Sequence, residues 1–231
     1  MSKTIGVVGG IGPESTVDYY RLLIARLRER AGRDAPDIVI NSINVARLLE
    51  LADKTDPIEL VSYLLGAVEA LSAAGAKLAF FAASTPHLVF DLVHSRASIP
   101  LVSLVLAACK AARTQNLRRV GLLGTRFTMQ GRFFQDVFAE AGITVVVPDT
   151  ADLEYVHEKY VHELVPGRFE ADTRAGVVAV IERMRTDKGI DGVILGGTEL
   201  PLLLRDVVHA LPCLDTTRIH VEAVVDFALS P

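Results

Sequence analysis

The 231-residue sequence lacks the features that several protein classes require. It has two cysteines, Cys109 and Cys213, which are far apart and form no CxxC pair, and this excludes a disulfide framework and a cysteine zinc site. No uninterrupted apolar stretch approaches the ~18 residues that a membrane span needs. The N-terminal run TIGVVGG has no signal-peptide pattern. Basic residues are scattered and the net charge is -4, so no nucleic-acid footprint is present. We therefore expect a cytoplasmic protein with reduced cysteines.

The sequence does contain an alternation of short β-branched runs and helix-length segments. The runs that we expect to be strands are Thr4–Val8, Ile38–Ile43, Leu78–Phe81, Leu101–Leu104, Val120–Leu123, Ile143–Val147, Gly192–Leu195 and Cys213–Leu214. Helical patterns at Ser15–Ala31, Pro57–Ala74 and Thr173–Lys188 lie between them. Nearly continuous apolar strands that alternate with helices are typical of parallel sheets covered on both faces. The sequence therefore predicts an α/β fold with mainly parallel sheets flanked by helices.

The same order of strands and turns occurs twice along the chain. IGVVGG begins at Ile5 and VGLLGT begins at Val120, an offset of 115 residues, and two later turns match when Ala83 is aligned with Gly197. This predicts a pseudo-twofold duplication with two similar lobes, residues 1–98 plus 211–231 and residues 99–210. We expect the last helix, Val221–Leu229, to pack on the first lobe. A single doubly wound sheet whose strands merely look alike is the alternative.

Candidate ligand-binding residues follow the predicted strands, because parallel sheets bind ligands beyond the carboxyl ends of their strands. These residues are small and polar, and many carry hydroxyls. They are Gly9-Gly10, Asn41, Asn44, Ala83-Ser84-Thr85, Ser103, Gly124-Thr125, Pro148-Asp149, Gly196-Gly197-Thr198-Glu199 and Asp215-Thr216-Thr217. Two facing lobes would bring both sets of turns to one cleft.

The Gly-rich stretch GGIGPEST follows the first strand and opens a helix. Its pattern is not G-x-G-x-x-G, no acidic residue ends the second strand, and no Gly-Lys-Ser/Thr is present, which argues against dinucleotide and P-loop sites. We expect a small carboxylate to be held here by Gly10, Ser15 or Thr16. A tight turn with Ser15 or Thr16 as the helix cap is an alternative that can hold at the same time.

Five motifs in this order resemble the aspartate/glutamate racemase family: GGIGPEST, a small-Ser-Thr-x-His turn, LLGTRFTM, GGTEL and LDTTRIH. The resemblance covers nearly the whole chain. It implies two α/β lobes with the substrate between them and an isomerase-type reaction that moves the α-proton of a small acidic amino acid. It also implies no pyridoxal phosphate, no other cofactor, no metal, and a homodimer. In the family, two cysteines exchange the α-proton, one from each lobe.

Both cysteine positions of the family are changed in this sequence. The first stretch reads Ala83-Ser84-Thr85 and the second reads Gly196-Gly197-Thr198-Glu199, so Ala83 and Gly197 stand where the cysteines would be. Neither residue titrates, whereas a two-base racemase needs a proton carrier on each face. The hydroxyls of Ser84, Thr85, Thr125 and Thr198 are expected to bind a carboxylate. Glu199 is expected either to act as a base or to bind an ammonium group or cap the turn.

Other candidates have two interpretations each. His87 is a candidate base or carboxylate ligand, or else a cap for the following helix. By the resemblance, Arg47 is a clamp for the side-chain carboxylate of the substrate, or else a surface arginine. Cys213 is read as a small core residue. The segment with His157 and His162 is read as a solvated, charge-laced helix, because its spacing is not that of a zinc site.

Three functions remain open for this pocket. The first is a racemase-class enzyme for an acidic amino acid, which we take as the family-level expectation. The second is a carbanion-type lyase or decarboxylase, and the third is a non-catalytic protein that binds a small carboxylate. The missing thiols disfavour the two-thiol mechanism, and in all three cases the expected ligand is a small carboxylate or amino acid.

Overall fold

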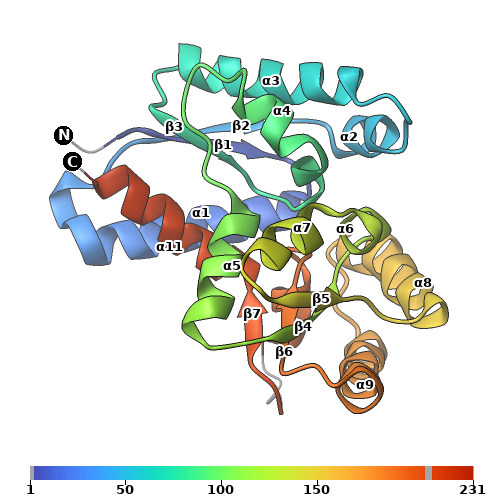
Figure 1. Ribbon diagram of the computed structural model, residues 1–231. Coiled ribbons are helices and arrows are strands. Elements are labelled where there is room, and N and C mark those ends of the chain that lie inside the picture. The colour runs from blue at the N-terminus through green and yellow to red at the C-terminus, as the bar shows by residue number, and fades with distance from the viewer. Residues whose placement is uncertain (1–2, 206–209, 231) are drawn as a thin grey trace. The chain divides into compact units, whose positions relative to one another are not determined.

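The computed structural model describes residues 3–205 and 210–230 (Figure 1). The chain divides into two compact units, unit 1 with Met1–Leu104 and His220–Pro231, and unit 2 with Val105–Ile219. Each unit is built on one parallel sheet, with the strand order β2-β1-β3 in unit 1 and β5-β4-β6-β7 in unit 2. The expected α/β fold with two parallel sheets is confirmed.

The sheet of unit 1 consists of β1 (Ile5–Gly9), β2 (Ile38–Ser42) and β3 (Leu78–Phe81). Its helices include α1 (Pro13–Ala31), α2 (Val45–Ala52), α3 (Ile58–Ala73), α4 (Phe90–His94) and most of α11 (Thr216–Leu229), with 3₁₀ turns at Gly32–Asp34 and Thr85–Val89. The predicted strand Leu78–Phe81 is found with the same bounds. The last helix begins at Thr216, five residues before the expected Val221.

Successive residues of β3 point to opposite faces of the sheet, and both faces are covered. Leu78 and Phe80 pack in a cluster with residues of α1 and α11, whereas Ala79 and Phe81 pack in a cluster with residues of α2 and α3. Figure 1 shows α3 on one side of this sheet and α1 with α11 on the other. The predicted packing of the last helix on the first lobe is confirmed by its buried residues Val221, Val224, Val225 and Ala228.

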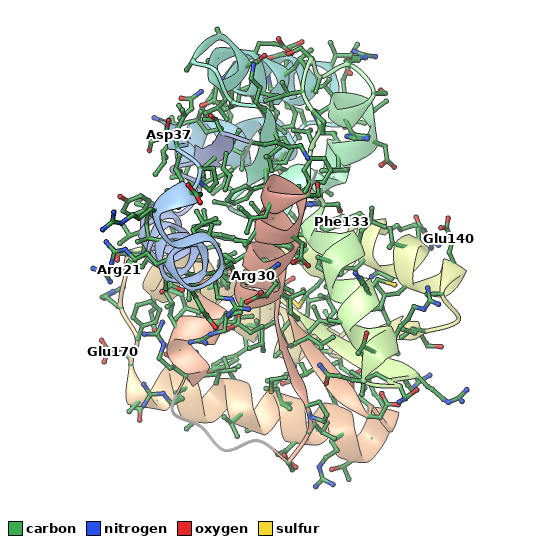
Figure 2. The ribbon with its side chains drawn as sticks, turned by 90° about the vertical axis from the view of Figure 1, so that its left-hand side faces the viewer. Arg21, Arg30, Asp37, Phe133, Glu140 and Glu170 are labelled. Atoms are coloured by element: carbon green, nitrogen blue, oxygen red, sulfur yellow. The ribbon has the colours of Figure 1, made fainter. Side chains whose placement is uncertain are left out.

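Ion pairs between α1 and α11 complement the apolar contact of these helices. Arg26 pairs with Glu222, and Arg30, which is labelled in Figure 2, pairs with Asp226 at 2.8 Å. These side chains are partly exposed, so the ion pairs are weak and most of the stabilisation comes from the buried aliphatic contact.

The sheet of unit 2 consists of β4 (Arg119–Leu123), β5 (Thr144–Val146), β6 (Gly192–Leu195) and β7 (Cys213–Asp215). Its helices are α5 (Leu104–Thr114), α6 (Arg126–Gln130), α7 (Phe133–Glu140), α8 (Thr150–Lys159), a π-helical turn at Tyr160–Leu164, α9 (Ala171–Lys188) and α10 (Leu200–Leu204). A buried cluster joins β6 to α8, α9 and α10.

The two sheets share one topology, which supports the predicted duplication. In each, the first strand lies between the second and the third, and a further segment follows beside the third. That segment is β7 in unit 2 but only a single bridge from Leu101 to Ala79 in unit 1. The predicted strand Leu101–Leu104 is therefore wrong beyond Leu101. The Val102 carbonyl and the Leu104 N–H bond to the side chains of His220 and His87, and α5 begins at Leu104.

The unit boundaries differ from the domain boundaries expected from the sequence. The expected boundary after residue 210 lies before β7, and β7 pairs with β6, with Leu195 opposite Asp215. The assignment of 1–98 plus 211–231 and 99–210 to separate domains stays a prediction, as does the expected cleft.

Candidate active site

The Gly-rich turn after β1 is closed by its own hydrogen bonds. The Gly10 N–H donates to Thr16 Oγ1 at 2.9 Å, and this hydroxyl donates to the Gly12 carbonyl at 3.0 Å. Gly10 has φ +83°, and a Cβ there would lie 2.6 Å from Ser42 Oγ, so only glycine fits. The N-cap of α1 is Gly12, so the expected capping by Ser15 or Thr16 is wrong. Thr16 instead holds the turn from inside the first turn of the helix.

The turn after β3 presents a buried hydroxyl. Ala83, Ser84 and Thr85 are all buried, and Ser84 is only 4% exposed. Among the described residues, Ser84 Oγ has no hydrogen-bond partner. A buried polar atom without a partner costs ~1–3 kcal/mol, which a bound polar ligand would recover. Ser84 Oγ could therefore donate to a ligand, and its expected role in binding a carboxylate stays a prediction.

His87 is fully engaged within unit 1. Its Nε2 accepts the N–H of Leu104 at 3.1 Å, so the proton stands on Nδ1, which lies 3.2 Å from the Ser84 carbonyl. The ring stacks on Phe90 with centroids 4.9 Å apart. Burial, with a smaller contribution from His220, lowers the pKa of His87 to about 3, so the imidazole is neutral. His87 therefore bonds the first residue of α5 and does not cap α4, the helix that follows His87 in the sequence. The direct role expected for His87 at the site stays a prediction.

Arg47 of α2 lies in a surface ion-pair network. Its guanidinium is 2.8 Å from Glu50 and 3.3 Å from Glu59, and its side chain is 44% exposed. The backbone N–H of Arg47 donates to Asn44 Oδ1, which caps α2. These contacts match the interpretation as a surface arginine, and the carboxylate clamp stays a prediction.

In unit 2, Thr125 caps α6. Its Oγ1 accepts the Thr128 N–H at 3.3 Å. The backbone N–H of Arg126, the residue after Thr125, donates to His157 Nδ1 at 3.2 Å. His162 pairs instead with Glu158 at 3.1 Å. Within residues 3–205 and 210–230, no group of three or more His, Cys, Asp or Glu side chains could hold a metal ion.

The histidine-containing helix is not solvated on all sides, which corrects the expectation from its charges. Val156, Tyr160 and Leu164 are buried at a spacing of four residues and pack in the core of unit 2. This spacing is visible in YVHEKYVHEL and could have revealed the buried face. Its consequence is that Tyr160 reaches the turn after β6, which sequence reasoning missed.

Glu199 is the centre of a buried polar cluster. It is 2% exposed, and its Oε2 accepts hydrogen bonds from Thr198 Oγ1 at 3.0 Å and from the Tyr160 hydroxyl. Burial and the negative charge of Glu199 raise the pKa of Tyr160 well above its usual value. The phenol therefore stays protonated at neutral pH and acts as a donor to the carboxylate.

Tyr160 also occupies the space beside Gly197. A Cβ added to Gly197 would lie 2.7 Å from the Tyr160 hydroxyl oxygen and 2.7 Å from Cζ, far inside van der Waals contact. The backbone φ of Gly197 is not positive, so the restriction is steric and comes from the tyrosine ring. At the turn after β6, the ring and hydroxyl of Tyr160 therefore occupy the space that a side chain at position 197 would need.

The Asp/Glu/Hydantoin racemase family matches residues 8–224 of this sequence. The chain belongs to this family. The resemblance drawn from the five motifs is thus confirmed at the level of the family. That Ala83 and Gly197 stand at the two cysteine positions of the family stays a prediction.

Solved structures of high similarity support the same assignment. An aspartate racemase homologue from Pyrococcus horikoshii is 35% identical, with a TM-score of 0.83, over 99% of this chain and 100% of that chain. A candidate Asp/Glu racemase from Yersinia pestis is 31% identical, with a TM-score of 0.87 and the same coverage. Glutamate racemase from Francisella tularensis, solved with D-glutamate, shares the fold at 17% identity and a TM-score of 0.73, over 98% of this chain and 81% of that chain.

The two cysteines of this family member lie elsewhere in the fold. Cys109 is buried in α5, and Cys213 lies in β7, where burial raises the pKa of its thiol to about 11. A thiol of such high pKa is almost entirely protonated at neutral pH and is a poor base and nucleophile. The described part of the chain also has no helix long and apolar enough to cross a membrane.

Proposed function

We propose that this family member moves the α-proton of a small acidic amino acid without a cofactor, with Glu199 as the base. The observation that carries the proposal is the family match over residues 8–224. The buried cluster around Glu199 supports it, since it supplies a carboxylate at the turn where the sequence lacks a thiol.

In the proposed reaction, the Glu199 carboxylate accepts the α-proton, so a Cα–H bond breaks and an O–H bond forms. The electron pair stays on the α-carbon and spreads into the substrate carboxylate, and the Glu199 carboxyl then returns a proton to carbon. Hydrogen bonds to the substrate carboxylate stabilise this carbanion-like intermediate, because they strengthen as negative charge develops. A single base returns the proton to one face, so inversion needs a proton from the other face. In this proposal water donates that proton to the α-carbon, and the hydroxide that forms takes up the proton held by Glu199.

The substrate-binding residues in this proposal come from the turns described above. Ser84 is the best supported, because its buried hydroxyl has no partner among the described residues. Thr85, Thr125 and Thr198 are the further hydroxyl donors. Four other residues belong to the proposed set as substrate ligands or neighbours of the reacting group: Gly10, Thr16, Arg47 and His87.

We also propose that the protein is a homodimer in the cytoplasm. Both cysteines are free, which suits a reducing compartment, and the family resemblance implies dimers. Light scattering coupled to size-exclusion chromatography tests the oligomeric state, with a mass near 50 kDa expected for two chains of 25.0 kDa.

The function is tested by incubating the protein with each enantiomer of aspartate and glutamate and separating the products by chiral chromatography. Calorimetry on the same samples measures binding. We expect binding of at least one acidic amino acid and the slow appearance of its opposite enantiomer. Release of carbon dioxide would indicate a decarboxylase, and binding without any reaction would indicate a binding protein; either result would overturn the proposal.

A further inference from the structure

We propose that Tyr160 is a positioning residue for Glu199 and that its ring makes glycine obligatory at position 197. The catalytic part of this inference rests on the proposed function, whereas the steric part stands on the fold of unit 2 alone. In this chain, Glu199 then supplies the base at the turn after β6, and Tyr160 positions it. The glycine at position 197 cannot supply a base.

The steric part follows from the packing of the ring. Tyr160 is buried in the core cluster of unit 2, and three atoms of its ring and hydroxyl are the nearest neighbours of a Cβ built on Gly197. A flexible side chain could move aside, but a buried aromatic ring has little freedom to do so. Any residue larger than glycine at position 197 must therefore displace Tyr160 and lose its bond to Glu199.

The positioning part follows from the hydrogen bonds. Tyr160 and Thr198 both donate to Oε2 of Glu199, and the backbone N–H of Glu199 lies 3.4 Å from the Tyr160 hydroxyl oxygen. The phenol is thus tied to both the side chain and the backbone of Glu199. Two donors to one oxygen fix the rotamer of the carboxylate, which a base needs in order to meet its proton in one geometry.

The backbone that carries Tyr160 is itself unusual. Helix α8 ends at Lys159, and Tyr160 begins a π-helical turn to Leu164. Single π-helical turns inserted next to α-helices are rare and often occur at functional sites. Here the turn begins at the residue that bonds Glu199, which agrees with a role for Tyr160 beyond filling the core.

Thermal unfolding tests the steric part without any activity. We expect Gly197→Ala to lower Tm by roughly 2–10 °C, the range that overpacking produces in a chain of this size. Gly66→Ala in α3 is the matched control, since nothing lies within 4 Å of its added Cβ, and it should not lower Tm. In a Tyr160→Leu background, which keeps an apolar core residue, Gly197→Ala should lower Tm by much less. Equal effects in both backgrounds would overturn the steric part.

The rate of α-proton exchange tests the positioning part. Tyr160→Phe keeps the ring and removes the donor, so it should slow exchange about tenfold with KM unchanged. In a Glu199→Gln background it should have no further effect. The matched control is Tyr155→Phe, in the preceding helix α8 and packed against Gly176 of α9, which should leave the rate unchanged.

The outcomes separate this inference from the proposed function. A Tyr160→Phe variant with raised KM and unchanged kcat, or additive effects of the two substitutions, would show that Tyr160 does not act through Glu199. If the wild-type protein exchanges the α-proton of no acidic amino acid, the proposed function fails and the positioning role fails with it. The unfolding comparison of Gly197→Ala in the two backgrounds would still confirm or overturn the steric part.

Discussion

Acidification should destabilise unit 1, because His87 and His220 are buried there as neutral imidazoles. Burial lowers the pKa of His220 to about 4 and, with the help of His220, that of His87 to about 3. His220 Nε2 donates to the Val102 carbonyl at 3.0 Å, and its Nδ1 accepts from the Tyr19 hydroxyl at 3.0 Å. His87 Nε2 can accept the Leu104 N–H only in the neutral form, and burial disfavours the charged form of both rings.

The magnitude follows from the linkage between proton binding and folding. In the unfolded chain a histidine has a pKa of about 6.5, so unfolding below that pH takes up a proton at each of the two sites. Stability is therefore full above pH 6.5 and falls as the pH drops toward 4 and 3. Each pH unit costs ~1.4 kcal/mol per histidine, so at pH 5 the two together remove roughly 4 kcal/mol. This is a large part of the ~5–15 kcal/mol that a typical domain has.

Urea unfolding followed by circular dichroism at several pH values between 7.5 and 5 measures this loss. The free energy of unfolding should decrease with a slope of about two protons near pH 5, and His220→Gln or His87→Gln should reduce the slope to about one. His94→Gln changes an exposed histidine and should leave the slope unaltered. A free energy of unfolding that stays constant from pH 7.5 to 5 would refute the reasoning.

Two further predictions concern cysteine chemistry. Iodoacetamide should leave activity intact at neutral pH, because burial raises the pKa of Cys213 to about 11; inactivation that follows the labelling of Cys213 would contradict this. The double change Ala83→Cys with Gly197→Cys should lower Tm by several degrees, and adding Tyr160→Ala should make room for the second thiol. If the double variant is as stable as wild type, the ring of Tyr160 does not exclude a side chain there.

Strand positions were predictable where the signal is local. Leu78–Phe81 and Gly192–Leu195 are apolar runs with small or polar residues on both sides, and the structure has both strands with these bounds. Leu101–Leu104 has the same local character, yet only Leu101 pairs with β3, in a single bridge to Ala79. Its backbone groups bond to side chains that are distant in sequence, and no local pattern contains that information.

The candidate site shows the same division. The motifs were sufficient to point to Ser84 and Glu199 as residues of the strand-end turns, because a parallel sheet places such turns at one edge. They did not reveal Tyr160, which approaches Glu199 from a helix whose charged residues dominate its sequence. Nor did they show that Thr16 is bonded to Gly10, since either a cap or a ligand role fits the same letters.

The most direct test of the central claim is the exchange of the substrate α-proton with solvent deuterium. Wild-type protein and Glu199→Gln are each incubated in D₂O with the enantiomers of aspartate and glutamate, and proton NMR records the loss of the α-proton signal. We expect wild type to exchange at least one of them and Glu199→Gln to be slower by a factor of about 10²–10⁴, the usual contribution of a general base. Equal exchange rates for the two proteins would show that Glu199 is not the base.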